Sequence, residues 1–232
     1  MDIISNTTIN MGNYGKITTC RVHCIHVKVK SISNSVTEMT RTISDTSWIN
    51  KLDTIPRITF EATSRKTIDK LVNDILSKVV DNVTDEFGEY LVSYTAQHVL
   101  ELGHSHNKVP LAELLKEKMS GNPGFDFHTE SVFNHIAFGE AKYSATETPR
   151  ADALNQICEF IQAKKDDMEL NMLQHFVSST AVNNYEKKKK GYVAAFSLNA
   201  QNVDTIFKNA LDSNIINSFM GYEELYLIAV EV

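Results

Sequence analysis

The sequence predicts an α/β fold, in which helices pack on a mixed β-sheet in an α+β manner. Three observations support this prediction. Apolar residues recur at helical spacing between residues 66 and 102, short β-branched and aromatic runs follow between 125 and 143, and helical and strand patterns then alternate. The 232 residues, of which 42% are hydrophobic and 22% charged, have a globular composition that excludes disorder.

Residues 1–65 are expected to form a β-rich N-terminal extension, with a strand over 17–32 and a second short strand near 57–62. The first 70 residues hold 10 Lys and Arg against 6 Asp and Glu, whereas residues 71–232 hold 13 against 23. The net-basic extension is a candidate surface for docking a partner. The acidic remainder attracts phosphates poorly, so nucleic-acid activity would require local basic patches, metal ions or a partner that holds the substrate.

Residues 66–232 are expected to form the main domain. Amphipathic spacing predicts a helix over 66–80, and Thr84 can cap a second helix that should stop at Gly103. A short helix over 111–118 should precede the Gly/Pro-rich segment 121–124. The elements expected after it are strands over 125–130 and 132–143, a helix over 150–176, a loop over 187–190, a strand over 191–199, a helix over 203–210 and a strand over 225–230.

The residues that carry chemistry lie in the two strands after this Gly/Pro segment. Glu140 and Lys142 project to one face of an otherwise apolar strand, where a charged pair is costly unless it is paired or binds metal. A hairpin centred near residue 133 would place Asp126 beside Glu140. Two convergent carboxylates suit a hard cation such as Mg²⁺, and the lysine would supply positive charge at a phosphoryl group. These groups meet the requirements of metal-assisted phosphodiester hydrolysis.

The preceding helix supplies a third candidate carboxylate, Glu89. Its helical neighbours Val92, Ala96 and Leu100 place it on an apolar stripe, where an isolated carboxylate would be destabilising. A metal ion or Lys142 nearby would relieve that cost. An ExK triplet alone is weak evidence, because Glu186-Lys-Lys188 is a second match in the lysine-rich loop.

Asp126 followed by Glu140-Ala141-Lys142 resembles the signature of the PD-(D/E)xK nuclease superfamily. Three segments narrow the resemblance to HamA, the nuclease subunit family of Hachiman anti-phage defence systems: Phe87-Gly-Glu89, Gly124-Phe-Asp126-Phe-His128 and Gly139-Glu-Ala-Lys-Tyr143. The similarity covers residues 66–232 in the order of their elements.

The resemblance implies a PD-(D/E)xK restriction-endonuclease-like core on a mixed β-sheet and a DNA nuclease that works with a HamB-like helicase subunit in a heteromeric complex. It also implies that Asp126 and Glu140 bind the metal, Mg²⁺ or Mn²⁺, that Lys142 assists catalysis, and that Glu89 supplies a helix-borne carboxylate. The partner would then provide the DNA affinity that an acidic chain lacks.

Further candidate contacts to phosphate are His128 and the run Lys187, Lys188, Lys189 and Lys190, for which a solvated loop is the alternative interpretation. The pair Cys20 and Cys24 is not expected to bind zinc, because an extended strand would hold the two residues ~13 Å apart. The His104-Ser-His106 turn is expected to be solvated, and His135 to be structural.

No phosphate-binding loop for ATP is present in the sequence, so ATP hydrolysis would have to reside in another chain. The first residues lack the pattern of a signal peptide, and no apolar run approaches the ~20 residues of a membrane span, so we expect a cytoplasmic protein without membrane contact. Two alternatives remain open: a non-catalytic binding subunit that keeps the nuclease fold in a nucleic-acid-processing complex, and a restriction-like endonuclease.

Overall fold

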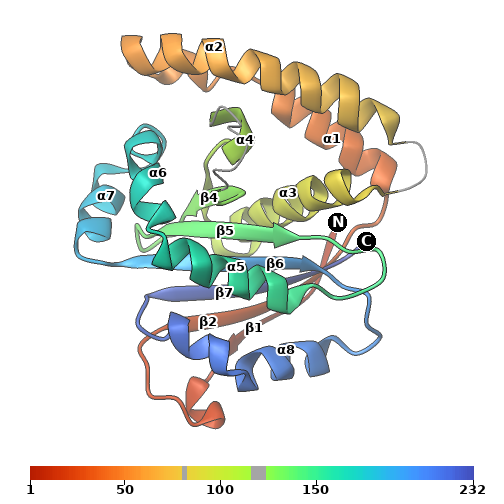
Figure 1. The fold of residues 1–232 in the computed structure, drawn as a ribbon, viewed down its shortest axis with the longest axis vertical. Coiled ribbons are helices and arrows are strands. Elements are labelled where there is room, and N and C mark those ends of the chain that lie inside the picture. Colours follow the sequence, from red (N-terminus) through yellow and green to blue (C-terminus); the bar gives the residue numbers. More distant parts are fainter. Residues whose placement is uncertain (80–82, 116–123) are drawn as a thin grey trace.

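The computed structural model describes residues 1–79, 83–115 and 124–232, and its centre is one seven-stranded sheet in the order β1-β2-β7-β6-β5-β4-β3 (Figure 1). In chain order the strands are β1 (Asp2–Ile9), β2 (Arg21–Lys28), β3 (Asn107–Lys108), β4 (Phe127–Glu130), β5 (Ile136–Lys142), β6 (Lys190–Ser197) and β7 (Glu224–Glu231). Strands β2, β7, β6 and β5 are parallel, and antiparallel pairs flank them on both sides. The predicted α/β class with a mixed sheet is confirmed.

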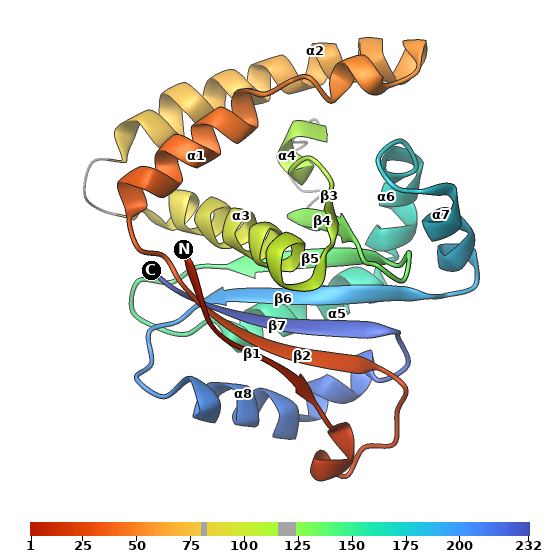
Figure 2. The same ribbon diagram turned by 180° about the vertical axis from the view of Figure 1, so that it is seen from behind.

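Helices cover both faces of the sheet. They are α1 (Ile32–Ser44), α2 (Thr54–Lys70), α3 (Asp85–His104), α4 (Ala112–Leu115), α5 (Arg150–Gln162), α6 (Lys165–Leu173), α7 (Ser179–Glu186) and α8 (Val203–Asp212). Figures 1 and 2 show α5 and α8 on one face, α3 on the other, and the pair α1 and α2 beyond α3. This arrangement leaves the end of the sheet where β5 finishes between α3 and α5.

The central strands are buried on both faces, as parallel strands between two helical layers must be. Strands β6 and β7 are buried along almost their whole length, in agreement with their apolar sequences. On the α5 face, Phe138 and Tyr192 pack with Ile157. On the α3 face, Leu91 and Val193 belong to the second core cluster. The central strands β5, β6 and β7 are therefore a packed apolar platform, and the charged residues Glu140, Lys142 and Glu224 lie at or near the ends of these strands.

The N-terminal part differs from its prediction. The strand expected near 57–62 is wrong, because these residues lie within α2, which begins after Asp53 and holds Pro56 in its first turn, where a missing N–H costs little. Strand β2 pairs with β7 over eight positions, so the N-terminal strands continue the main sheet. Helices α1 and α7 and strand β1 were not predicted.

Several predicted boundaries also shift. Helix α2 ends at Lys70 and is followed by a π-helical turn (Leu71–Ile75) and a 3-10 turn (Leu76–Lys78), so the helix expected over 66–80 is wrong in extent. The helix expected over 150–176 divides into α5 and α6 at Lys164, which has a left-handed φ of 53°. The predicted helix 111–118 and the segment 121–124 fall partly on 116–123, outside the described residues.

The start and end of α3 agree closely with the sequence. The Thr84 hydroxyl accepts a hydrogen bond from the Phe87 N–H at 3.3 Å, which confirms the predicted cap. The helix ends at His104, one residue after Gly103, because Ser105 adopts a left-handed conformation with φ of 54°. Within the ranges that the structure covers, no helix has the length and apolarity needed to cross a membrane.

Candidate active site

The β4–β5 hairpin brings two of the predicted carboxylates together. Phe127 pairs with Gly139, and this antiparallel register continues to set Asp126 beside Glu140. The Asp126 N–H donates to the Gly139 carbonyl at 2.9 Å, and Asp126 Oδ2 accepts a hydrogen bond from the Ala141 N–H at 2.8 Å. The predicted neighbourhood of Asp126 and Glu140 is therefore confirmed.

Glu140 is the most unusual ionisable group of the hairpin. It is 1% exposed, and one carboxylate oxygen, Oε1, lies 2.8 Å from Lys142 Nζ. Its other oxygen, Oε2, is buried and has no hydrogen-bond partner among the described residues. Burial first, and then the negative charge of Asp126, raise the pKa of Glu140 well above 4.5, although Lys142 opposes the rise. A buried oxygen in this state can accept a cation or a proton.

Lys142 lies at the end of β5, where its side chain is 21% exposed. Burial alone would lower the pKa of Lys142, but the Glu140 carboxylate, followed by Asp126 and Glu89, raises it above 10.5. The ammonium group is therefore kept charged. Lys142 can stabilise negative charge on a phosphoryl oxygen, and it is unsuited to removing a proton from water near neutral pH.

Glu89 approaches this group from α3, but it does not lie on a buried stripe. Its side chain is 49% exposed, so the expectation of an apolar environment is wrong. The reason is that α3 buries residues on either side of Glu89 while this position faces outward. Glu89 Oε1 nevertheless lies 3.9 Å from Lys142 Nζ, and its charge contributes to the raised pKa of Glu140.

Two glycines permit close packing at the site, Gly88 between α3 and the end of the hairpin and Gly139 between the two strands of the hairpin. A Cβ atom on Gly88 would lie 2.2 Å from the Tyr143 ring, and one on Gly139 would lie 2.3 Å from the Phe127 ring. Each glycine immediately precedes a carboxylate of the group, Glu89 or Glu140. The three sequence segments that carry the resemblance thus contact one another in the fold.

A buried carboxylate of α6 fixes the chain on both sides of Asp126. Glu169 Oε1 accepts a hydrogen bond from the Phe125 N–H at 3.1 Å, and Glu169 Oε2 lies 2.6 Å from His128 Nε2. His128 is fully buried, and its ring also packs against Phe138. The predicted phosphate contact of His128 therefore has no support in its position. Sequence patterns gave no signal for Glu169.

The lysine run lies at the opposite end of the strands. Lys190 begins β6 and pairs with Ile136, six positions before Lys142 on β5, which corresponds to roughly 20 Å along the sheet. Lys190 forms an ion pair with Asp166, whereas the other three lysines are exposed. No phosphate group could contact the run and Glu140 at the same time.

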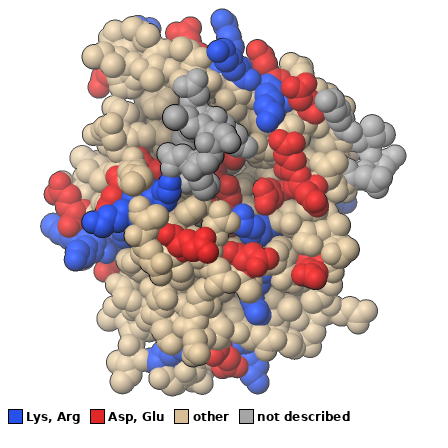
Figure 3. Space-filling model, in the orientation of Figure 1, with Lys and Arg blue, Asp and Glu red and all other residues tan. Residues whose placement is uncertain are grey.

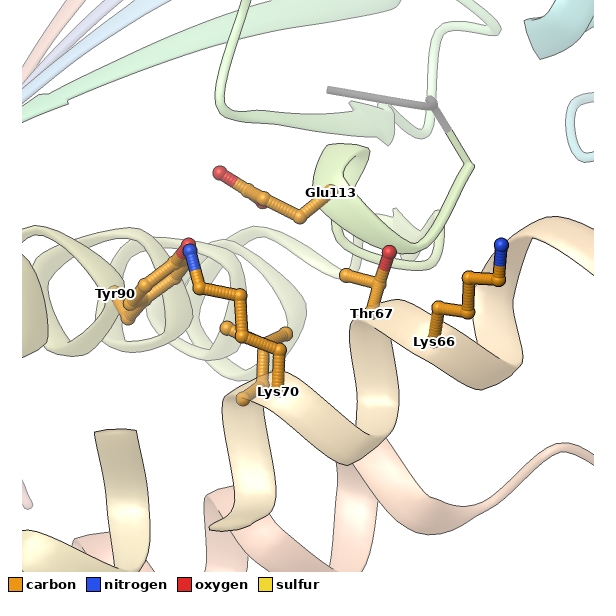
Figure 4. Close-up of a pocket in the computed structure, with 6 residues that line it drawn as sticks. Lys66, Thr67, Lys70, Tyr90 and Glu113 are labelled. Atoms are coloured by element: carbon orange, nitrogen blue, oxygen red, sulfur yellow. The ribbon is translucent and has the colours of Figure 1, made fainter. Parts of the chain in front are cut away.

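A pocket of about 190 Å³ lies between α2, α3 and α4 (Figure 4). Its lining residues are Lys66, Thr67, Lys70, Leu71, Tyr90 and Glu113. Figure 4 shows Lys70 of α2 extending toward Tyr90, with Glu113 of α4 facing α2 across the pocket. Burial, followed by the carboxylates of Glu113, Glu86, Asp126 and Glu89, raises the pKa of Tyr90, so the pocket adjoins the candidate site. Its lining combines two lysines with one carboxylate, Glu113.

Asp126 and Glu140 are the described residues best placed to hold a divalent cation. Both carry oxygen donors, which Mg²⁺ and Mn²⁺ prefer, and the unpartnered Oε2 of Glu140 fits such a ligand. In the described ranges, no group of three or more His, Cys, Asp or Glu side chains is arranged around one metal position. Water or substrate oxygens would therefore complete the coordination.

A second buried polar cluster was missed. Glu224 on β7 is 1% exposed and accepts hydrogen bonds from Ser131 at 2.7 Å, His135 at 3.0 Å and Tyr226 at 3.0 Å. The Tyr226 hydroxyl also lies 3.1 Å from the ring of His106, which is 3% exposed, so the expected solvation of His106 is wrong. The structural role expected for His135 agrees with its bond to Glu224.

A scan of protein-family models and a search of curated proteins both found no match to the chain. The function is therefore inferred from the geometry of the site. The geometry offers a paired carboxylate, a retained ammonium group and an adjoining pocket. These groups together can bind a cation and an anionic substrate.

Proposed function

We propose that this chain is a divalent-cation-dependent nuclease that hydrolyses phosphodiester bonds in DNA. The single observation that carries the proposal is Glu140, a buried carboxylate with one oxygen unpartnered among the described residues, held beside Asp126 and 2.8 Å from Lys142. Strongly perturbed carboxylates of this kind are concentrated at functional sites. A purely structural pair would have both oxygens satisfied.

Each residue has a defined task in this proposal. Asp126 and Glu140 would hold Mg²⁺ or Mn²⁺. The hydrogen bond from the Ala141 N–H holds the Asp126 carboxylate against β5, next to Glu140. When bound, the cation supplies positive charge to the attacked phosphoryl group. Lys142 would move from Glu140 to a phosphate oxygen and stabilise the charge that develops there. Glu89, at 3.9 Å from Lys142, would keep the ammonium near the site.

The adjoining pocket would position the polynucleotide backbone. Lys66 and Lys70 of α2 line it together with Tyr90 of α3, whose carboxylate neighbours include Asp126 and Glu89. Phosphate groups flanking the cleaved bond would lie against the two lysines, because charge-assisted contacts to phosphate position a strand without reading its sequence. This geometry favours cleavage without strong base preference.

The biological role follows from the resemblance to the Hachiman nuclease family. We propose that the chain is the cytoplasmic effector of an anti-phage defence system and forms a heteromeric complex with a HamB-like helicase. The support is that the three family-like segments meet around Glu89, Glu140 and Lys142, and that a chain with a formal charge of −6 benefits from a partner that binds DNA.

Two observations favour a second function, a non-catalytic binding subunit. Lys142 forms an ion pair with Glu140, and no third metal-ligating side chain completes a metal site among the described residues. Such a subunit would use the hairpin as a structural ion pair and would not require a cation.

The decisive assay is cleavage of plasmid DNA with Mg²⁺ or Mn²⁺, with and without the helicase subunit. Variants Asp126→Asn, Glu140→Gln and Lys142→Met should each lose about a hundredfold or more in rate. Glu147→Gln is the matched control, because Glu147 is an exposed carboxylate shortly after β5. Cleavage that is equal in all variants, or absent from the wild type with partner and cation present, would contradict nuclease function. The latter result would favour the binding subunit.

A further inference from the structure

An exposed patch lies at the opposite end of the sheet from the carboxylate site. We define the hairpin-tip patch by Phe133 in the turn between β4 and β5, Arg21 at the start of β2, and the lysines Lys187, Lys188 and Lys189 between α7 and β6. Phe133 is 49% exposed, and the neighbouring Val132 is 57% exposed. Two adjacent large apolar side chains are therefore exposed beside several cations.

One residue of α7 ties the two segments of the patch together. Asn184 Nδ2 donates to the Asn134 carbonyl at 2.9 Å and to the Phe133 carbonyl at 3.4 Å. The Asn184 carbonyl in turn accepts hydrogen bonds from the N–H groups of Lys187 at 3.0 Å and Lys189 at 2.9 Å. The aromatic turn and the lysine turn are therefore fixed as neighbours, although they are some 50 residues apart in sequence.

The Phe133 ring is also held in position. The Arg21 guanidinium carbon lies 3.7 Å from the ring centroid, and Arg21 Nη2 lies 3.6 Å from Glu224 Oε1, which is buried beneath. The Phe133 ring also stacks with the ring of His135, with 6.2 Å between the two ring centroids. A ring that is fixed by a cation and by a buried network, yet half exposed, is preorganised for a planar ligand and loses little entropy on binding.

The charges of the patch are not neutralised. Lys190 is paired with Asp166, but Lys187, Lys188 and Lys189 form no ion pair within the described part of the chain. Figure 3 shows Lys and Arg side chains gathered at the left edge of the molecule, near α7 and the start of β6 in Figure 1. Glu186 precedes the lysines in sequence, and Glu223 lies beside them in space through backbone hydrogen bonds to Arg21 and Lys190. Four cations against these two carboxylates leave the patch a positive excess.

We propose that the hairpin-tip patch binds single-stranded DNA or RNA, with phosphates on the lysines and a base on Phe133. Single-strand sites combine a cationic surface with an aromatic platform on which a base can stack. The lysine run contains no aromatic residue, but the fold places Phe133 of the hairpin turn beside it. The patch lies roughly 20 Å from Lys142, so a strand could occupy both sites at once. Binding here does not require the proposed cleavage activity.

The test is fluorescence anisotropy of the full chain with a labelled oligothymidylate, in EDTA so that cleavage is excluded. Phe133→Leu keeps apolar bulk and loses the aromatic face, and we expect roughly five- to tenfold weaker binding. Changing all three lysines to Gln should reduce the slope of log affinity against log salt by about 2. The matched control changes the exposed Lys51, Arg57 and Lys208 to Gln, which removes the same charge and should leave the slope unchanged.

Several results would overturn the proposal. They are equal binding by the patch and control variants, tighter binding to duplex DNA that is insensitive to Phe133→Leu, or binding of polyglutamate in place of the oligonucleotide. Thermal melting of each variant separates lost binding from lost folding. The patch variants should keep cation binding at Glu140, and Glu140→Gln should keep oligonucleotide binding, so failure of this proposal is distinguishable from failure of the nuclease proposal.

Discussion

Two buried carboxylates in the same sheet, Glu140 and Glu224, are each 1% exposed and yet have opposite environments. Glu224 receives hydrogen bonds from Ser131, His135 and Tyr226 and lies 3.6 Å from Arg21. Glu140 contacts Lys142 through one oxygen only, and its other oxygen has no hydrogen-bond partner in the described structure. The two ends of the sheet thus hold a satisfied and an unsatisfied carboxylate.

The pKa values of Glu224 and Glu140 shift in opposite directions because the two carboxylates have different hydrogen-bond and charge partners. Burial would raise the pKa of Glu224, but the bonds from Ser131 and His135 and the charge of Arg21 lower it below 4.5. Burial and Asp126 raise the pKa of Glu140. A satisfied carboxylate stabilises the fold, whereas an unsatisfied one costs stability that a bound cation can return. We therefore interpret Glu224 as structural and Glu140 as functional.

The largest expected effect is on folding. Glu224→Gln should lower the free energy of unfolding by about 3 kcal/mol, because it replaces a charged acceptor at the centre of a buried network. Glu140→Gln should change it by less than about 1 kcal/mol, because the variant removes a costly buried charge and Lys142 can reach solvent. Urea unfolding measures both values. Equal losses of unfolding free energy in the two variants would contradict the assignment of Glu224 as structural and Glu140 as functional.

The second effect is pH dependence at the Glu224 end. His23 and His106 pack on Tyr226, and burial lowers the pKa of each to about 4. The unfolded chain binds more protons than the folded chain between about pH 4 and 6.5, so stability rises with pH across this window and is lost as pH falls through it.

The variant His106→Gln tests this assignment. It should remove about 2 kcal/mol of the stability change between pH 4 and 6.5, with the free energy of unfolding measured at each pH. The groups that face His106 are Thr129, Tyr226, His104, His23 and Glu224. An unchanged slope in the variant would show that other groups titrate in the window.

A third, smaller effect concerns cation affinity at Asp126 and Glu140. Glu169→Gln should weaken cation affinity about tenfold, because Glu169 holds the Phe125 N–H and His128 on either side of Asp126 and thereby orients this carboxylate. Calorimetry with Mn²⁺ measures the affinity, and Glu159→Gln on the exposed side of α5 is the control. Equal affinity in the wild type and both variants would mean that Asp126 is positioned by the hairpin alone.

The smallest effect concerns Glu89. Its side chain is 49% exposed and 3.9 Å from Lys142 Nζ, so Glu89→Gln should change stability by less than about 0.5 kcal/mol. We expect cation affinity to fall no more than about threefold, as for a charge near the cation but outside its coordination shell. A loss of a hundredfold or more would make Glu89 a direct ligand.

The sequence could predict the hairpin site because its parts are close along the chain. Two strands with a period of two and one short turn set the pairing of Asp126 with Glu140. The Glu224 network could not be predicted in this way, since its partners Ser131 and His135 lie 93 and 89 residues away. The exposure of Glu89 was missed because α3 is buried around most of its circumference, which obscures the helical period.

Isothermal titration of Mn²⁺ into the wild type, Glu140→Gln and Glu224→Gln is the most direct test of the proposed cation site, because it requires neither DNA nor a partner. We expect one site in the wild type, its loss in Glu140→Gln, and its retention in Glu224→Gln at a temperature where that variant is folded. Absence of binding in the wild type, or equal binding in all three proteins, would contradict the assignment of Asp126 and Glu140 to a cation.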